Sequence, residues 1–129
     1  MMTVGVPIAR LFGIEIRISF TWAFLVAIVT LIGAEEAAVS APSLAAPVQW
    51  LIGALVALAF LASVIAHELA HALVGRRYGV PATSILLGFV GGLAPLNIQA
   101  DSPRRELAIA IAGPALSLGV GVVLLGVGV

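Results

Sequence analysis

Three long apolar runs dominate the sequence, and each predicts a helix that crosses a membrane. The first extends over about 18–33 and the second over about 48–75. The third follows Pro103, where we expect a spanning helix over about 104–129. Because about 20 helical residues cover a hydrocarbon core of about 30 Å, the second run is longer than one crossing requires.

The segments between these runs have different patterns. Within the first 17 residues, two stretches of alternating apolar and polar positions meet at Gly13, which is typical of a short β-hairpin. Residues 79–100 are apolar but rich in glycine and proline, which favours a re-entrant β-hairpin with strands near 82–87 and 93–98, although a surface loop is the alternative. Serine and proline in 34–47 predict a loop.

Local signals mark the start of the third helix. Ser102 is suited to cap it, Pro103 fits the first helical position, and Glu106 favours the first turn because of the helix dipole. Small residues then form a face on which another helix can pack closely, namely Gly113, Pro114, Ser117 and Gly119.

Composition agrees with a membrane protein. Of the 129 residues, 62% are hydrophobic and 9% are charged, and the mean hydropathy is +1.24, whereas soluble domains are about half apolar. Trp22 and Trp50 lie near the starts of the first two runs, where interfacial aromatic residues are expected. We therefore expect an all-α membrane protein, a single domain over 1–129 with three transmembrane helices, an N-terminal β-hairpin, and a re-entrant β-hairpin between helices two and three.

The charges indicate an orientation rather than a charged partner. Six arginines balance six acidic residues, so the net charge gives no indication of nucleic acid binding. All six arginines lie on one side of the predicted spans, whereas Glu35 and Glu36 lie on the other. The positive-inside rule then predicts a multi-pass protein of the cell membrane whose N-terminus and arginine-rich side face the cytoplasm. The chain has no cysteine, which excludes disulfides and thiolate ligands.

The second apolar run contains an H-E-x-x-H motif formed by His67, Glu68 and His71. Residues four apart share a helix face, so both imidazoles can bind one Zn²⁺ ion, and the glutamate of such motifs takes a proton from water as a general base. The alternative is a pair of structural histidines beside an ion-paired glutamate. The metal site is favoured because the only two histidines of the chain both lie here, in a segment where polar groups are costly to bury.

An H-E-x-x-H motif inside a membrane-spanning helix resembles the site-2 protease family of intramembrane zinc metalloproteases. Three further features are similar in order and spacing, namely the Arg-Arg-Tyr-Gly turn at 76–79, the Gly-Gly pair at 91–92, and the Ala-Gly-Pro sequence at 112–114. The stretch at 11–17 is also similar to bacterial and archaeal members. The resemblance therefore extends over nearly the whole chain.

The resemblance implies zinc as the cofactor, with His67 and His71 as ligands and Glu68 as the general base. It implies cleavage of the transmembrane segments of membrane proteins within the lipid bilayer, with an unwound substrate added as a strand to the re-entrant hairpin. The family takes its third ligand, an aspartate, from a later helix that has no counterpart here, and Asp101 and Glu106 fit better as helix-start residues. We therefore expect the N-terminal part of a longer protease, inactive alone without a third ligand.

Two other functions are compatible with the sequence. An inactive homologue would act as a binding module for membrane proteins. A zinc-binding transport or structural protein would instead carry acidic or histidine residues on several spans, but the interiors of the first and third predicted spans contain none. The substrate and the oligomeric state are not indicated by any motif.

The arginine distribution generates a topology prediction. Reporter fusions at Ser40 and Val129 should be external, and a fusion at Arg77 should be cytoplasmic, because arginines are retained on the cytoplasmic side. The measurement is the activity of compartment-specific reporters in intact cells. An external signal at Arg77 would reverse the assigned orientation.

Overall fold

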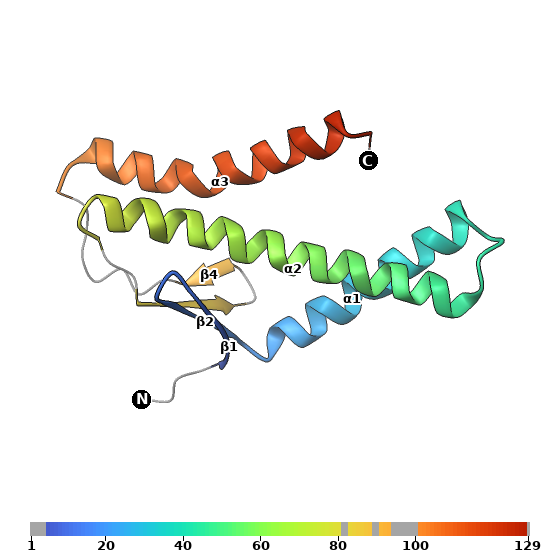
Figure 1. The fold of residues 1–129 in the computed structure, drawn as a ribbon. Coiled ribbons are helices and arrows are strands. Elements are labelled where there is room, and N and C mark those ends of the chain that lie inside the picture. The colour runs from blue at the N-terminus through green and yellow to red at the C-terminus, as the bar shows by residue number, and fades with distance from the viewer. Residues whose placement is uncertain (1–4, 81–82, 89–90, 94–100, 129) are drawn as a thin grey trace.

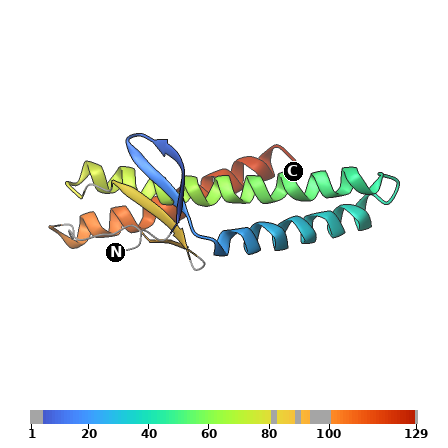
Figure 2. The same ribbon diagram turned by 90° about the horizontal axis from the view of Figure 1, so that it is seen from below.

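The computed structural model describes residues 5–80, 83–88, 91–93 and 101–128. In chain order the elements are β1 (Val6–Leu11), β2 (Ile14–Ile18), α1 (Thr21–Ser40), α2 (Ala46–Arg77), β3 (Ser84–Gly88), β4 (Gly91–Leu93) and α3 (Pro103–Gly126). Figure 1 shows α2 as the central element, with α3 on one side of it and the sheet on the other. Seen from below in Figure 2, α1 runs alongside the half of α2 that lies away from the sheet.

The three helices are each long and apolar enough to cross a membrane. Only 11%, 11% and 6% of the most apolar stretches of α1, α2 and α3 are buried within the protein, so most of their apolar side chains are left for lipid or other protein to cover. The three expected spanning helices are thus confirmed by length and composition. The helical start signals before α3 are also confirmed, because the Ser102 hydroxyl accepts a hydrogen bond from the Arg105 backbone N–H at 3.4 Å.

The predicted loop over 34–47 is wrong at both ends. α1 continues to Ser40, because alanine and glutamate favour helix and the Ser40 hydroxyl donates to the Glu36 carboxylate at 3.2 Å, one turn away. α2 already begins at Ala46, with Pro47 in its first turn, where the missing N–H of proline has no helical partner to lose. The connection between the two helices is correspondingly short.

Four short strands form one sheet in the order β1-β2-β3-β4. β1 and β2 form the expected antiparallel hairpin, whose turn has positive φ angles of 53° at Phe12 and 77° at Gly13. β2 pairs in parallel with β3, which pairs antiparallel with β4. A second antiparallel pair is therefore present, but the strand expected over 93–98 lies almost wholly outside the described residues. Its re-entrant position in a bilayer stays a prediction.

The core of the described residues lies between the sheet and α2. Alternate residues of a strand point to the same face, which explains why Ile14 and Ile16 of β2 and Ile85 and Leu87 of β3 are buried. These strand residues pack with two side chains of α2, and the cluster consists of Ile14, Ile16, Ile85, Leu87, Leu69 and Ala72.

Trp22 also belongs to this core, so its indole packs against protein, and its position at the membrane interface stays a prediction. Its side chain is 3% exposed, and its indole N–H donates to the Gly88 carbonyl at 3.0 Å. α1 begins only three residues after β2 ends, and this short connection places the first turn of α1 beside the sheet. This hydrogen bond therefore links the start of α1 to the end of β3.

Close packing of α1 against α2 generates a stability prediction. A Cβ atom on Gly53 would lie 2.8 Å from the Ala34 backbone nitrogen and 3.2 Å from the Ala34 Cβ. Gly53→Ala should therefore lower the free energy of unfolding by about 1–3 kcal/mol through overpacking. Thermal unfolding in detergent measures the change. Gly121→Ala is the matched control, since a Cβ there meets nothing within 4 Å, and equal losses in the two variants would contradict the packing argument.

Candidate metal centre

The H-E-x-x-H motif lies in the second half of α2, where the helix is held between the sheet and α3 (Figure 1). At 3.6 residues per turn, His67 and His71 share one face and Leu69 lies on the opposite face. Leu69 is buried in the core against the sheet. The packing of α2 on the sheet therefore directs both histidines toward α3.

The two imidazoles converge through their Nε2 atoms. The Nε2 of His67 lies 3.2 Å from the Nε2 of His71, and the ring centroids are 4.9 Å apart with the planes at 75°. Two nitrogen ligands of one tetrahedral Zn²⁺, each about 2.0–2.1 Å from the ion, are separated by about 3.3 Å. The observed separation thus matches two corners of a zinc tetrahedron.

The other nitrogen of each ring is held by α3. The Nδ1 of His71 lies 2.7 Å from the backbone carbonyl oxygen of Ile109, and since a carbonyl can only accept, this Nδ1 carries the proton. The Nε2 of His71 then presents its lone pair. The Nδ1 of His67 lies 2.8 Å from the Ser117 hydroxyl oxygen. Such partners of the second nitrogen are usual for metal-binding histidines, because they fix the ring orientation and the tautomer.

A glycine of α3 packs closely against the paired nitrogens. Gly113 is buried on α3, and a Cβ built on it would lie 2.6 Å from the Nε2 of His67, 2.7 Å from the Cε1 of His71, and closer still to the Nε2 of His71. Any side chain at this position would therefore collide with the two imidazoles, so the close approach of α3 to the histidines requires glycine here. The two nitrogen donors fit Zn²⁺, for which neutral imidazole is a preferred ligand.

Glu68 lies between the two packed faces of α2. It follows His67 by about 100° around the helix, which places it on the flank between the α3 side and the sheet side. Its side chain is half-buried. A carboxylate in this position is next to the first imidazole without sharing the face of the two nitrogen donors.

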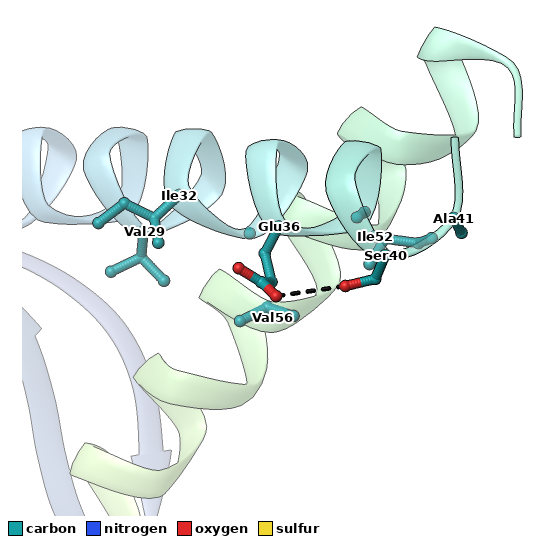
Figure 3. Close-up of a pocket in the computed structure, with 9 residues that line it drawn as sticks. Val29, Ile32, Glu36, Ser40, Ala41, Ile52 and Val56 are labelled. Atoms are coloured by element: carbon teal, nitrogen blue, oxygen red, sulfur yellow. Dashed lines mark hydrogen bonds between the residues drawn. The ribbon is translucent and has the colours of Figure 1, made fainter. Parts of the chain in front are cut away.

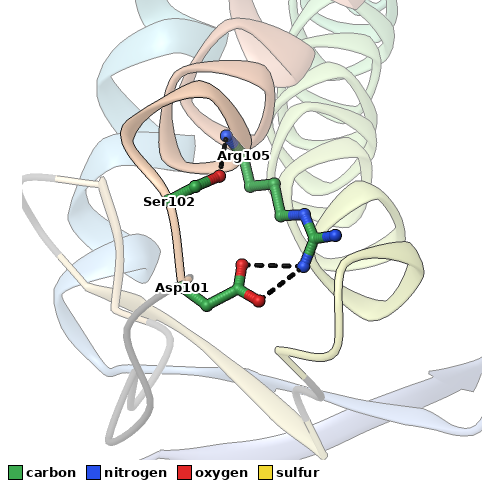
Figure 4. A network of polar contacts seen from close by, with 3 residues as sticks. All are labelled: Asp101, Ser102 and Arg105. Carbon is green, nitrogen blue, oxygen red and sulfur yellow. Dashed lines mark hydrogen bonds and ion pairs between the residues drawn. The ribbon is translucent and has the colours of Figure 1, made fainter.

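No further ligand completes the site within the part of the chain that the structure describes. No group of three or more histidine, cysteine or acidic side chains suited to a metal occurs there. The Asp101 carboxylate accepts two hydrogen bonds of 2.7 Å from the Arg105 guanidinium, as Figure 4 shows, and Glu106 is exposed in the first turn of α3. Both acids thus lie at the start of α3, and the two histidines would supply two ligand positions.

A groove of about 570 Å³ lies elsewhere, between α1 and α2. Figure 3 shows Val29, Ile32 and Val56 along it, with Glu36 bonded to Ser40 near its end. Its α2 residues precede His67 by eleven positions or more, about 16 Å along the helix. The groove is therefore separate from the paired histidines.

The sequence predicted that the two histidines bind a metal and that α3 has a small-residue face for helix packing. It did not predict that this face packs against the two histidines. Ile109, Gly113 and Ser117 recur every four residues, so they share one face of α3. The same spacing relates His67 and His71 on α2. Matching these two four-residue patterns is the signal that could have indicated the contact before the structure.

Comparison with known proteins gives consistent matches. The sequence profile of peptidase family M50 matches residues 55–129. A Synechocystis protein that carries a zinc-metalloprotease name is 38% identical over 117 residues, which are 91% of this chain and 31% of that protein. A zinc metalloprotease of Methanocaldococcus jannaschii is 33% identical over 125 residues, covering 96% of this chain and 32% of the relative. The chain thus spans about a third of the length of these relatives.

A solved structure matches as well. The site-2 protease from Methanocaldococcus jannaschii superimposes with a TM-score of 0.65 and 30% sequence identity, over 95% of this chain and 50% of that one. The match covers the helices and the sheet that hold the paired histidines.

The convergence of the imidazoles generates a metal-binding prediction. His67→Ala or His71→Ala should each remove most of the zinc from the purified protein, because each deletes one ligand. Glu68→Gln should leave the zinc largely bound, since this side chain is not on the ligand face. Elemental analysis after dialysis measures the zinc content, and equal content in all three variants would contradict the ligand assignment.

Proposed function

The chain belongs to peptidase family M50, the site-2 protease family, and we propose that it acts in a zinc-dependent intramembrane endopeptidase that cleaves transmembrane segments of membrane proteins. The observation that carries the proposal is the 3.2 Å approach of two imidazole Nε2 atoms on a helix apolar enough to span a membrane. A binding module without catalysis would not need two nitrogen donors at the separation that a shared zinc ion sets.

The proposed chemistry divides between the metal and the chain. A zinc ion held by His67 and His71 would supply the Lewis acidity that activates water and polarises the scissile carbonyl. Glu68, beside the first ligand, would take the proton of the attacking water and then deliver it to the leaving amine. The apolar residues around the motif would limit access of bulk water, which strengthens these electrostatic interactions.

A third protein ligand is part of this proposal. Catalytic zinc sites generally use three protein ligands and leave one position for water. Since the described residues supply two, we propose that residues 1–129 alone do not cleave substrate and that a further ligand completes the site. The comparison with relatives about three times as long is compatible with a ligand from outside this segment.

The proposed substrate is a transmembrane segment in an extended form. A helical segment keeps its carbonyl groups in its own hydrogen bonds, so it must unwind before a carbonyl can reach the metal. β4 lies at one end of the sheet order, and the backbone groups on its outer side would bind an extended segment as an added strand. Segments with helix-breaking residues near the cleavage point should therefore be preferred.

We also propose an orientation for the site. Arg76 and Arg77 form the last turn of α2, and the positive-inside rule assigns this end to the cytoplasm. His71 precedes Arg76 by five residues, about 8 Å along the helix. The metal site would then lie in the cytoplasmic half of the bilayer.

The general base provides the test of the proposed function. In the full-length protein as its gene encodes it, Glu68→Gln should lower cleavage of a model transmembrane substrate at least about 100-fold, because general-base catalysis is lost. Cleavage is measured in detergent by gel analysis of the products. Glu36→Gln makes the same chemical change at an exposed position on α1 and should cleave normally. Cleavage by Glu68→Gln at the rate of this control would refute the assigned role.

A further inference from the structure

We propose that Ser117 is the positioning residue of the metal ligand His67. The proposal rests on the proposed function, since it concerns the same metal centre. It gives α3 a role beyond spanning the membrane, which is to orient the ring of His67. The serine hydroxyl would hold the imidazole in the one orientation in which its Nε2 meets the Nε2 of His71.

The position of the serine on α3 supports this assignment. Between residues 107 and 126, Ser117 is the only polar side chain, so a single hydroxyl interrupts an otherwise apolar helix. Its oxygen lies 2.8 Å from the Nδ1 of His67, fifty residues away in sequence. A polar side chain in a membrane-spanning segment is costly unless it has a partner, and this one has a ring nitrogen of a metal ligand.

The contact faces of the two helices align in register. Gly75 packs near the Ile109 side chain, since a Cβ built on this glycine would lie 3.9 Å from the Ile109 Cδ1. One turn earlier on α2, His71 bonds the Ile109 carbonyl, and a further turn earlier His67 bonds Ser117. Gly113 lies between these contacts, directly over both Nε2 atoms. The antiparallel packing of α2 and α3 thus brings both outer partners to the histidines at once.

The two ligands are held by different kinds of group. The partner of His71 is a backbone carbonyl, which no side-chain substitution removes. The partner of His67 is a side-chain hydroxyl, so the orientation of this ring depends on the residue at position 117. Without the hydroxyl, rotation about the Cβ–Cγ bond of His67 would be opposed only by packing against α3, and its Nε2 would leave the shared position for part of the time.

The experiment compares zinc affinity in three variants of the full-length protein. Ser117→Ala should weaken zinc binding about 10- to 100-fold, the usual loss when an outer partner of a metal-bound histidine is removed. Ser117→Thr keeps the hydroxyl and should restore affinity to within about threefold of the unmodified protein, within the scatter of such effects. Competition with a chromogenic zinc chelator measures the dissociation constants.

Ser63→Ala is the matched control. Its hydroxyl donates to the Phe60 carbonyl of its own helix at 2.8 Å, one turn before His67, and its loss should leave zinc affinity unchanged. Ser117 is exposed, so the thermal unfolding temperature of the metal-free Ser117→Ala protein should match that of the unmodified protein. A drop in both affinity and unfolding temperature that threonine does not rescue would assign Ser117 a packing role instead.

The outcomes separate this inference from the proposed function. If the unmodified protein binds zinc through His67 and Ser117→Ala binds it equally well, the positioning role is wrong while the metal centre stands. If His67→Ala leaves zinc affinity unchanged, the metal centre itself is wrong. A selective loss in Ser117→Ala, with recovery in Ser117→Thr, supports both.

Discussion

The arrangement of the candidate site depends on the burial of one face of α2 against the sheet. Leu69 and Ala72 pack with isoleucine and leucine side chains of the two central strands, and this apolar contact fixes the rotation of α2 about its own axis. Because His67 and His71 lie on the other side of the same helical turns, that rotation decides where they point. The packing of α2 on the sheet thus determines where the two imidazoles point, although the imidazoles are not part of this contact.

The helix that receives the histidines is specialised in a complementary way. α3 offers a carbonyl, a glycine and a hydroxyl at four-residue intervals, and each meets a different part of the imidazole pair. A larger residue in place of the glycine would collide with the two imidazoles. An apolar residue in place of the serine would leave one ring nitrogen without its partner. The contacts with the two histidines therefore explain why this face of α3 carries a glycine and a serine.

Much of this organisation could be predicted from sequence, for identifiable reasons. The three helices follow from apolar runs, the first hairpin from period-two alternation, and the start of α3 from Ser102 and Pro103, since all of these are local signals. The pairing of His67 with Ser117 could not be read locally, because it needs the register between two helices fifty residues apart. The burial of Trp22 could not be predicted for a related reason, since it depends on the parallel pairing of β2 and β3, which brings Gly88 to the start of α1.

The unequal lengths of α1 and α2 have a consequence for the packing of the motif. α1 has 20 residues and α2 has 32, and their packing places Trp22, at the start of α1, beside Phe60, with ring centroids 6.1 Å apart. The start of α1 therefore lies beside α2 about two turns before His67, and the rest of α1 runs along the earlier part of α2. Among the described elements, the turns that carry the motif are bordered by α3 and by short strands rather than by α1. The shorter helix thus covers the first half of α2, and the turns that carry the motif depend on α3 and the sheet for their packing.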